Sequence, residues 1–514
     1  MNIRPLALCA GLALVSAAPA RAADPNPNGA IVYFDAVSNQ TLDPREPQNN
    51  SSFAQGPIMA IFDSLVTLDA AGNPTPGLAE SWKYNADLTE ITLTLRRGVT
   101  FHDGTPFNAA AVVRNFQRTT ELGQRAGYAA LETVSQMAAM ETPDDYTVRL
   151  KLKGPNGQMP YLLGTQGGMM ISPASLDGDA FGSSLKPVGA GPFKVRSFDS
   201  NVRTVMERYD GYWGGAAGRP ATIEHQFVPD GRARLNAVRS GQANLALIDA
   251  RQIAEAKSAG FAVQINEKNS TWDIYLNVKR QNIGNLKVRQ AFMHALDRQA
   301  VSDALGYGAS KPTAQLFAQS SPMYDKALEE IYPFDQAKAK KLLTEAGYPN
   351  GVDITWVLLN TPEYKQIAEA VQAMMGEVGI RIKFDVVDVS QYITFRRPPT
   401  RGDIMMARWG GRPDPLQSFQ EVTGTGGSVN AGDAASPEID ALIEKARRLD
   451  PADPARTAVL KQLARLTTEL AAHFGVMTRS NVYAYKPGCI SGIPAYLPTG
   501  NDRINDMKIA VGCK

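Results

Sequence analysis

The alternation of apolar and polar residues along this chain predicts strands and helices that follow one another. Residues 91–95 alternate apolar and polar side chains, which is the period-two pattern of a half-buried strand. Apolar side chains recur at helical spacing in residues 288–305 and 367–378. Residues 354–359 and 380–387 are apolar runs of strand length. Alternating helices and strands imply an α/β fold in which helices cover a mixed or parallel sheet.

Capping residues mark several helix starts. Asn108 and Asp335 each precede a run with helical spacing, and both are residue types that accept hydrogen bonds from the first turn of a helix. Ser436 and Asp453 are each followed by proline, which fits the first helical position. We expect a helix to begin directly after each of these four residues.

The first residues have the pattern of an export signal. Arg4 supplies the positive start, residues 6–15 form the apolar middle, and residues 20–22 (Ala-Arg-Ala) match a cleavage pattern of small residues. We therefore expect a signal peptide over residues 1–22, cleavage after Ala22, and a protein exported to the periplasm. No later apolar stretch approaches the length that a membrane span needs.

Length and charge narrow the function classes. The chain that remains after cleavage has about 490 residues, which is too long for a single core, so two or more compact lobes are expected. The whole chain has 53 basic and 51 acidic side chains, and loss of Arg4 and Arg21 with the signal leaves equal numbers. A chain without net charge gives no reason to expect nucleic acid or an anionic membrane as a partner.

Cysteine and histidine usage favours a structural bridge over a metal site. Cys489 and Cys513 remain after cleavage, and in an oxidising compartment we expect them to form a disulfide that ties down the C-terminal tail. The histidines are scattered singly at positions 102, 225, 294 and 473. Neither a Walker A sequence nor a His-Glu-x-x-His motif occurs, so we expect no cofactor, no metal site and no catalytic residues.

One segment carries a more specific signal. Residues 78–113 (LAESWKYNADLTEITLTLRRGVTFHDGTPFNAAAVV) indicate strand, tight turn and helix, and their wording closely resembles the signature of the family 5 extracellular solute-binding proteins. Proteins of that family serve ABC importers of peptides, nickel and related solutes. Further stretches agree with the family in the expected order: 189–195 (GAGPFKV), 207–215 (ERYDGYWGG), 288–292 (VRQAF), 295–298 (ALDR) and 338–348 (KAKKLLTEAGY). The resemblance covers essentially the whole mature chain.

This resemblance implies a two-lobed periplasmic-binding-protein fold, class II-like, with an extra subdomain in the first lobe. We expect residues 23–271 in the first lobe, with the subdomain at about 60–180, and residues 272–484 in the second lobe. The segment 485–514 would return to the first lobe, so the chain would cross twice and the hinge would lie at the crossings. The resemblance further implies a protein that closes over a ligand and presents it to the membrane permease of an ABC importer. We also expect a monomer, and no enzyme, because no catalytic constellation is found.

The stretch Arg-Trp-Gly-Gly-Arg-Pro-Asp-Pro at residues 408–415 is the leading candidate for ligand contact. Trp409 offers an apolar plate, and Gly410 and Gly411 allow close approach of the backbone. The alternative is an ordinary turn in which Trp409 fills the core and the charged residues lie in solvent.

Two charges in this stretch bear on the kind of ligand. In the resembled family the matching loop lines the cleft, and peptide-binding members often carry an acidic residue there that pairs with the peptide amine. Asp414 is the candidate for that role, whereas Arg412 stands where the dipeptide-binding version would carry an acid. Arg412 therefore either donates a pair of hydrogen bonds to a ligand carboxylate or phosphate, or pairs with Asp414 to shape the pocket. A surface Arg-Asp pair of little energetic value is the alternative.

Further candidates lie near the expected crossing and in loops of both lobes. Trp272 would present an indole toward the cleft, although core packing is an almost equal alternative. The other residues with a possible ligand contact are Tyr275 and Asn277 near the crossing, Tyr392 and Arg397 in the second lobe, and Asn39 after the first strand.

The sequence therefore predicts an exported receptor that captures a small polar ligand, a peptide or peptide-like solute, for an ABC importer. A receptor for an acidic conjugate, such as an opine or a sugar phosphate, is the alternative within the family. Two alternatives come from other classes. One is a secreted hydrolase, and the other is a module that holds unfolded chains in the exported compartment.

Overall fold

The computed structural model describes residues 24–46, 56–177, 187–395, 401–493, 496–497 and 504–513. The expected signal peptide lies outside these residues. Within the described ranges, no helix is both long enough and apolar enough to cross a membrane.

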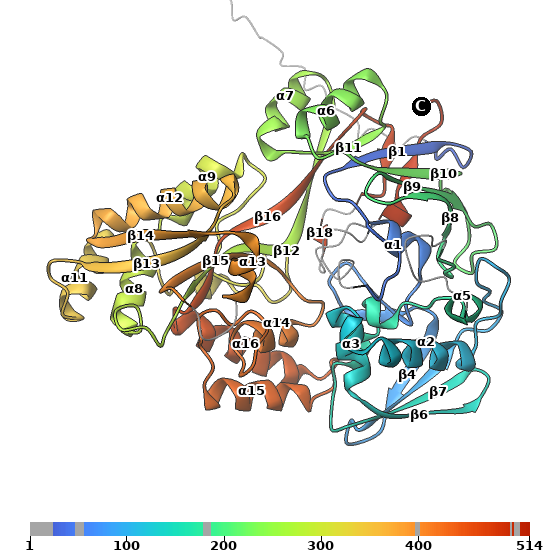
Figure 1. Cartoon of the computed structure of the whole chain (residues 1–514), viewed down its shortest axis with the longest axis horizontal. Helices are drawn as coiled ribbons and strands as arrows, with labels where there is room; N and C mark the ends of the chain where they lie inside the picture. The colour runs from blue at the N-terminus through green and yellow to red at the C-terminus, as the bar shows by residue number, and fades with distance from the viewer. Residues whose placement is uncertain are drawn as a thin grey trace, which may run out of the picture.

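One mixed sheet runs through most of the molecule (Figure 1). In the described part of the chain it has eleven strands, ordered β14-β13-β15-β12-β16-β11-β1-β10-β9-β8, with β18 paired to β12. Their bounds are β1 Ala30–Asp35, β8 Phe193–Asp199, β9 Arg203–Arg208, β10 Thr222–Phe227, β11 Leu245–Ile248, β12 Ala262–Leu276, β13 Val352–Leu359, β14 Ile380–Val387, β15 Ile404–Gly410, β16 His473–Tyr485 and β18 Tyr496–Leu497. The α/β class predicted from the apolar pattern is confirmed.

The second lobe is built on β13, β14 and β15, which run parallel. The helices that accompany these strands are α8 Leu286–Ala295, α9 Arg298–Gly306, α10 Lys326–Glu329, α11 Gln336–Glu345, α12 Pro362–Glu377 and α13 Val389–Thr394. α12 buries Ile367, Val371 and Met375 in the core that also holds Trp356 of β13. The helical spacing read from residues 367–378 therefore describes a real buried face.

A separate helical layer completes the second lobe. It consists of α14 Pro415–Val422, α15 Pro437–Arg447 and α16 Pro454–Glu469. These helices share a core of their own, which includes Leu416, Phe419 and Leu463. The expected caps are present, because Ser436 and Asp453 accept backbone hydrogen bonds from the first turns of α15 and α16, and Asn108 and Asp335 do the same for α2 (Ala109–Leu122) and α11.

The first lobe contains β1 and β8 to β11, together with a small subdomain. The bounds of its remaining elements are α1 Gly56–Ile61, α6 Gly231–Ser240 and α7 Ile253–Ser258 in the main part, and β2 Val66–Leu68, β3 Pro74–Pro76, β4 Ala79–Tyr84, β5 Glu90–Leu95, β6 Met137–Asp144, β7 Thr147–Leu152, α3 Tyr128–Ser135, α4 Met159–Leu162 and α5 Pro173–Asp177 in or beside the subdomain. The subdomain sheet has the order β4-β5-β7-β6. Ile91, Leu93 and Leu95 of β5 are fully buried there, as their alternation predicts.

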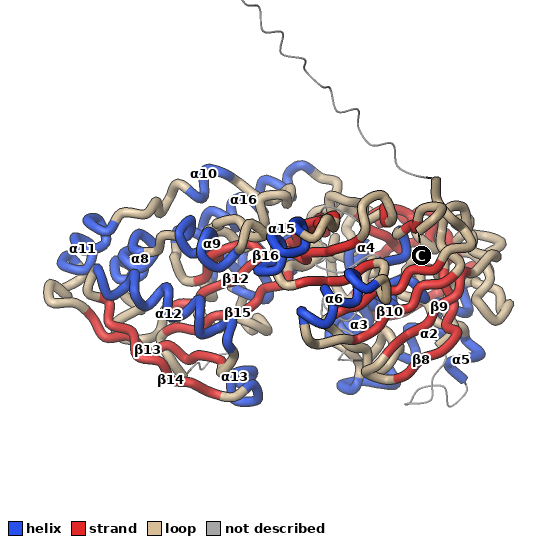
Figure 2. Tube along the Cα trace, turned by 90° about the horizontal axis from the view of Figure 1, so that it is seen from above, coloured by secondary structure: helices blue, strands red, loops and turns tan. Residues whose placement is uncertain are grey.

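Two long antiparallel strands, β12 and β16, carry the chain between the lobes (Figure 2). The first part of β12 pairs with the end of β16, beside β11 of the first lobe. The later part, from Ser270 onward, pairs with β15 of the second lobe. A shift in register separates the two parts between Glu267 and Thr271. The expected boundaries at 271/272 and 484/485 fall within these two strands, although Val482–Tyr485 pair with β11 of the first lobe.

The lobes also touch at a second place, where the subdomain meets the α14–α16 layer. The backbone N–H of Gly157 donates to the carbonyl of Arg447 at 2.8 Å. A Cβ at Gly157 would lie 2.1 Å from the carbonyl oxygen of Leu449, so only glycine allows this approach without displacement. The subdomain and the second lobe are therefore in direct backbone contact.

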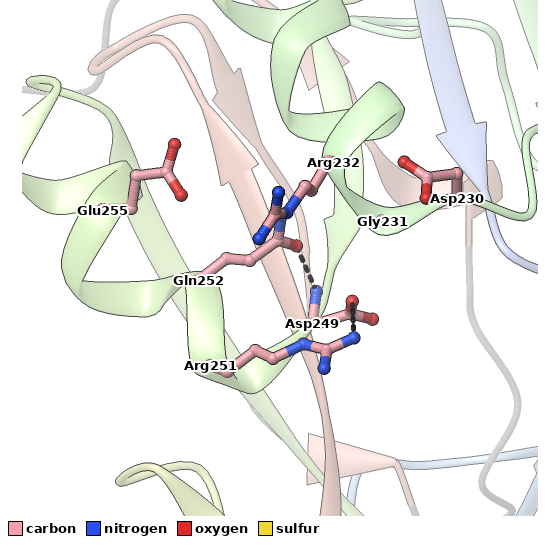
Figure 3. Close-up of a pocket in the computed structure, with 7 residues that line it drawn as sticks. All are labelled: Asp230, Gly231, Arg232, Asp249, Arg251, Gln252 and Glu255. Atoms are coloured by element: carbon pink, nitrogen blue, oxygen red, sulfur yellow. Dashed lines mark hydrogen bonds and ion pairs between the residues drawn. The ribbon is translucent and has the colours of Figure 1, made fainter. Parts of the chain in front are cut away.

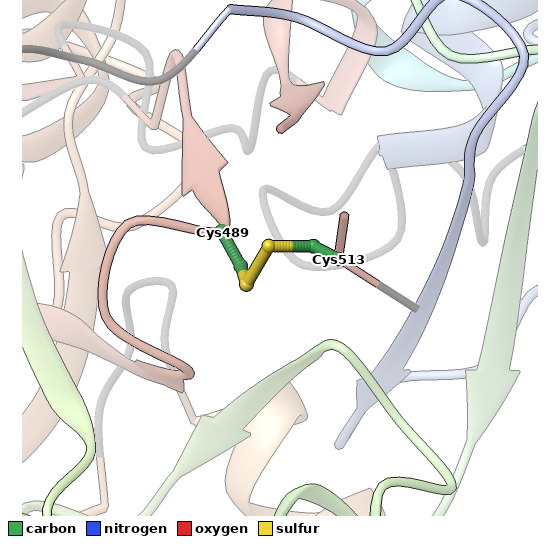
Figure 4. The surroundings of a disulfide bond; sticks show 2 residues. All are labelled: Cys489 and Cys513. Atoms are coloured by element: carbon green, nitrogen blue, oxygen red, sulfur yellow. A yellow bond between two sulfur atoms is a disulfide. The ribbon is translucent and has the colours of Figure 1, made fainter. Parts of the chain in front are cut away.

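A disulfide closes the C-terminal segment (Figure 4). Cys489 and Cys513 are bonded to each other, with Cα atoms 5.6 Å apart. Between them β17 (Ile490–Ser491) pairs with β19 (Lys508–Ile509), and the backbone N–H of Asn26 donates to the carbonyl of Ile509. The tail is thereby fastened to the start of the first lobe.

Removal of this disulfide should lower the melting temperature. The bond joins residues separated by 24 positions. A bridge over a loop of that length stabilises a fold by ~3 kcal/mol, mainly because it restricts the unfolded chain. We expect Cys489→Ser/Cys513→Ser to melt earlier by calorimetry, and a reductant to bring the natural protein to the same temperature. Equal melting of oxidised and reduced protein would contradict this role.

Candidate functional site

The parallel strands of both lobes point their carboxyl ends toward the crossing strands. β15 ends at Gly410, opposite Ser270 of β12. β11 ends at Ile248, opposite Val482 of β16. β13 and β14 run parallel to β15, and β1 and β10 run parallel to β11. Ligands of open α/β sheets bind outside the carboxyl ends of the strands, so the region beside the crossing is the candidate ligand site.

An open pocket of about 310 Å³ lies at this edge of the first lobe (Figure 3). It is formed by the start of α6 and by the turn after β11. Its lining residues are Asp230, Gly231, Arg232, Asp249, Arg251, Gln252 and Glu255. The Asp249 carboxylate pairs with Arg251 at 3.2 Å and with Arg234 at 3.5 Å. The pocket therefore presents charges of both signs, which suits a polar contact rather than an apolar one.

Trp409 belongs to the core of the second lobe. Its side chain is 2% exposed and packs with Leu416 and Phe419 in the α14–α16 layer. The Arg412 guanidinium lies 5.0 Å from the centre of its ring. Of the two interpretations of Trp409, the structure therefore supports core packing, because in this conformation the indole has no open face to offer a ligand.

Asp414 is fully buried and already holds a cation. Its carboxylate accepts a hydrogen bond from Nη2 of Arg456 at 2.6 Å and one from Nε2 of Gln158 at 3.0 Å. Its other oxygen accepts from the backbone N–H of Leu416 at 3.1 Å and so caps α14. A peptide amine could reach Asp414 only if it displaced this buried cation, so in this conformation the carboxylate joins α14 to α16.

Arg412 pairs with Glu421 and not with Asp414. Nε and Nη2 of Arg412 each donate to one carboxylate oxygen of Glu421 at 2.6 Å, a bidentate arrangement. Nη1 donates to the carbonyl of Gly410 at 3.1 Å. Of the alternatives for Arg412, the pair with Asp414 is therefore wrong in this structure. A ligand anion on Arg412 would have to displace Glu421, whose side chain is 3% exposed.

Close backbone approach, expected for the two glycines, occurs between the loop and β12. The backbone N–H of Gly411 donates to the carbonyl of Asn269 at 2.7 Å. A Cβ at Gly411 would lie 2.5 Å from that same oxygen. Gly410 pairs with Ser270 at the end of the β12–β15 ladder. In this structure both glycines hold the loop against the crossing strand.

Trp272 is 7% exposed and packs in the core of the second lobe, as the alternative of core packing predicts. Together with Tyr364, Arg479 and Arg408 it forms an aromatic and cationic corner beside the crossing, the Trp272 corner. Tyr364 meets it edge to face at 5.2 Å between ring centres. The Arg479 guanidinium lies 5.6 Å from the Trp272 ring and donates to the hydroxyl of Ser270 at 3.1 Å. Burial lowers the pKa of Arg479 to about 10, and Arg408 of β15, which lies opposite Trp272 of β12, lowers it as well. Arg479 therefore keeps its charge at neutral pH.

The other candidates are buried or fall outside the described residues. Tyr275 stacks on His473 at 4.0 Å, and the Tyr392 hydroxyl accepts from the backbone N–H of Met406 at 3.1 Å. Asn277 and Asn39 are buried, and the carbonyl of Asn39 accepts from the backbone of Asn201. Arg397 lies in the part of the chain that is not described.

A second charged group lies where the subdomain meets α14. Glu132 of α3 accepts from the side-chain amide of Gln417 at 2.6 Å. Burial raises the pKa of Glu132 to about 7, and the nearby Glu421 raises it as well. Arg412 lowers it, but that guanidinium is shared with Glu421. Glu132 is therefore partly protonated near neutral pH.

The sequence did not predict the residues that surround Trp272 or the residues that bind Asp414. Arg479 and Glu363 lie at the Trp272 corner, and Gln158 and Arg456 hold Asp414. Glu363 had a usable signal, since it follows β13 directly and so belongs to the carboxyl edge of the second-lobe sheet. Arg456 had none, because its helix turns toward Asp414 only in the folded lobe. No group of three or more metal-ligating side chains is found in the described ranges.

The Asp414–Arg456 pair should be important for stability. Arg456→Met would leave a carboxylate buried without its cation, which costs about 3–5 kcal/mol. We expect a large fall in the melting temperature, and recovery of much of it in Arg456→Met/Asp414→Asn, in which the amide keeps the cap. Arg465→Met on the same helix is the matched control, because the Arg465–Glu469 pair is exposed and contributes little. Equal melting of the two single variants would contradict the assignment.

Comparisons with known proteins agree with the architecture. The family model of the bacterial extracellular solute-binding proteins, family 5, matches residues 73–430. The glutathione-binding protein GsiB of Salmonella choleraesuis is 29% identical over 354 residues, which is 68% of each chain. NikA from Brucella suis, solved in complex with Fe(III)-EDTA, is 26% identical with a TM-score of 0.80, covering 92% of this chain and 99% of that one.

A further solved structure shares the fold over nearly the whole of both chains. HbpA2 from Haemophilus parasuis superposes with a TM-score of 0.81 at 22% identity, over 94% of this chain and 100% of that one. The two-lobed fold expected from residues 78–113 and from the motifs that follow them is thereby confirmed. The chain belongs to the bacterial extracellular solute-binding proteins of family 5.

Proposed function

We propose that this protein is an exported receptor that binds a small, carboxylate-bearing solute, a peptide or peptide-like compound, between its two lobes and delivers it to the membrane permease of an ABC importer. Family 5 proteins bind small ligands and work with such a permease. The exported location, the monomeric state and the ligand class are proposals for this chain. Its task is capture and delivery, so no turnover of the ligand is involved.

The observation that carries the ligand class is the cationic corner at Trp272. Arg408 lies near enough to lower the pKa of Arg479, and Arg479 lies over the Trp272 ring. Planar guanidinium groups bind carboxylates through two parallel hydrogen bonds, and the indole adds apolar surface. The corner lies beside the crossing, at the carboxyl edge of the sheet, where a ligand could touch both lobes.

Two relatives have ligands of compatible chemistry. GsiB is named as a glutathione-binding protein, and NikA was solved with Fe(III)-EDTA. Both glutathione and EDTA carry at least two carboxylates. Neither name assigns a ligand to this chain, but both support a family site in which carboxylates are recognised.

An acidic conjugate, such as an opine, is the second candidate. Two neighbouring guanidinium groups favour such a ligand, because together they can bind two carboxylates, or one carboxylate and one phosphate. The loop carboxylate Asp414 is held by Arg456, so the amine contact of the dipeptide-binding version has no counterpart there.

Closure of the lobes would strengthen the contacts at this corner. Expulsion of water strengthens the attraction between opposite charges, and loops from both lobes could then surround the ligand. The ligand must bind the closed form more tightly than the open form, because only differential affinity moves the equilibrium. The lobes would rotate relative to each other where β12 and β16 pass from one lobe to the other, at the register shift after Glu267.

A thermal-shift screen followed by calorimetry tests the proposal. The mature protein is screened against di- and tripeptides, opine-like conjugates, sugar phosphates, oligosaccharides and nickel chelates. A ligand that binds only the folded state raises its stability by RT ln(1 + [L]/Kd), about 2.7 kcal/mol at a hundredfold excess over Kd. We expect a rise with carboxylate-bearing classes, and none with neutral oligosaccharides.

Arg479→Gln is the variant that connects this binding to the corner. We expect it to weaken a carboxylate-bearing ligand by ~10- to 100-fold, since a hydrogen bond to a charged group contributes about 1.5–3 kcal/mol. Arg448→Gln, at the exposed end of α15, is the matched control and should bind as the natural protein does. Absence of binding by every class, or unchanged affinity in Arg479→Gln, would contradict the proposal.

A further inference from the structure

The carboxylates of the loop after β15 and of α14 are engaged within the second lobe. Asp414 holds Arg456, and Glu421 holds Arg412 through both of its oxygens. Glu421 also accepts from the hydroxyl of Ser428 at 3.0 Å. A ligand with an ammonium group therefore needs a different carboxylate as its partner.

Glu363 has the position and the exposure for that contact. It lies in the first turn of α12, directly after β13, at the carboxyl edge of the second-lobe sheet. Its side chain is 67% exposed, and its carboxylate lies 3.9 Å from Nη1 of Arg408, which is beyond hydrogen-bond distance. An exposed pair at that distance contributes little, so its rearrangement around a ligand would cost little.

The same carboxylate acts on the cationic corner. Glu363 and Arg408 both influence the protonation of Arg479, in opposite directions, so the three charges lie in one electrostatic neighbourhood. Tyr364, the next residue along α12, packs against Trp272. The aromatic corner is therefore flanked by two guanidinium groups and one carboxylate, which is the charge pattern that complements a carboxylate with a neighbouring ammonium group.

We propose that Glu363 is the specificity-determining residue that receives the ammonium group of the ligand, while Arg479 and Arg408 receive its carboxylate. This inference rests on the proposed function, because it assumes that the ligand binds at the Trp272 corner. It narrows the ligand to zwitterionic solutes, which are free peptides or conjugates that keep an amine. It assigns the amine contact to the start of α12 instead of the loop at Asp414.

The test compares two ligands that differ only in the amine. A dipeptide that shifts the melting temperature in the screen, or failing that an amine-bearing opine-like conjugate, is measured by calorimetry as the free amine and as its N-acetyl derivative. We expect the natural protein to prefer the free amine by ~10-fold, which corresponds to one charge-assisted contact of about 1.4 kcal/mol. Glu363→Gln should bring this preference to within about twofold, while the N-acetyl compound keeps its affinity.

Matched variants separate this role from a general effect of charge. Glu369→Gln removes an exposed carboxylate from the same helix, six residues further on, about 9 Å along the axis, and should keep the full preference. Glu363→Asp retains the charge and should restore part of the preference. Arg479→Gln should weaken both compounds alike, since both carry the carboxylate.

Each outcome decides between the two proposals. A preference that survives in Glu363→Gln, or a natural protein that binds both compounds equally, would overturn the role of Glu363 and leave the receptor proposal in place. Affinity for both compounds that is unchanged in Arg479→Gln would overturn the binding corner, and the role of Glu363 with it. Failure of every amine-bearing compound to bind would also exclude the zwitterionic class.

Discussion

The pairing of β12 with β16 is the constraint on which the rest of this structure depends. Both strands begin in the sheet of one lobe and end in that of the other, so one ladder of backbone hydrogen bonds carries both crossings. The ladder changes register between Glu267 and Thr271, where residues 266–271 are all polar and buried. Buried polar groups favour hydrogen-bonded partners, and some of these residues have them in loops that converge on the crossing, as Glu267 does with Lys311. Asn269, for example, receives the backbone of Gly411.

The charged groups of the second lobe form two sets, one that joins elements and one for which recognition is proposed. The Asp414–Arg456 pair and the Arg412–Glu421 pair join the loop after β15 to α14 and α16, and Gln158 and Glu132 extend these contacts to the subdomain. These groups fix how the helical layer meets the first lobe. Of the charges beside Trp272, Arg479 lies on the crossing strand β16, Arg408 on β15 and Glu363 on α12, and the Arg408–Glu363 pair is long and exposed. Recognition is proposed at these charges because the Arg408–Glu363 pair is longer and more exposed than the pairs of Asp414 and Glu421.

Local sequence signals gave the elements, because they depend on neighbours along the chain. The caps at Asn108 and Asp335 and the buried alternation of β5 follow from three to six consecutive residues each. Partners across the fold do not follow in this way. Asp414 meets Arg456 from 42 positions away, and nothing near either residue predicts the pair. The two tryptophans pack into different cores, Trp409 among helices α14 to α16 and Trp272 against Tyr364 of α12, a difference set by which face of the sheet each residue occupies.

A crystal structure of the mature protein with a ligand from the carboxylate-bearing classes tests the central claim most directly. The account predicts a ligand carboxylate within hydrogen-bond distance of the Arg479 guanidinium, an apolar part of the ligand against Trp272, and Asp414 still bonded to Arg456. The account would be contradicted by a ligand whose carboxylate displaces Glu421 from the Arg412 guanidinium, or by one whose amine displaces Arg456 from Asp414.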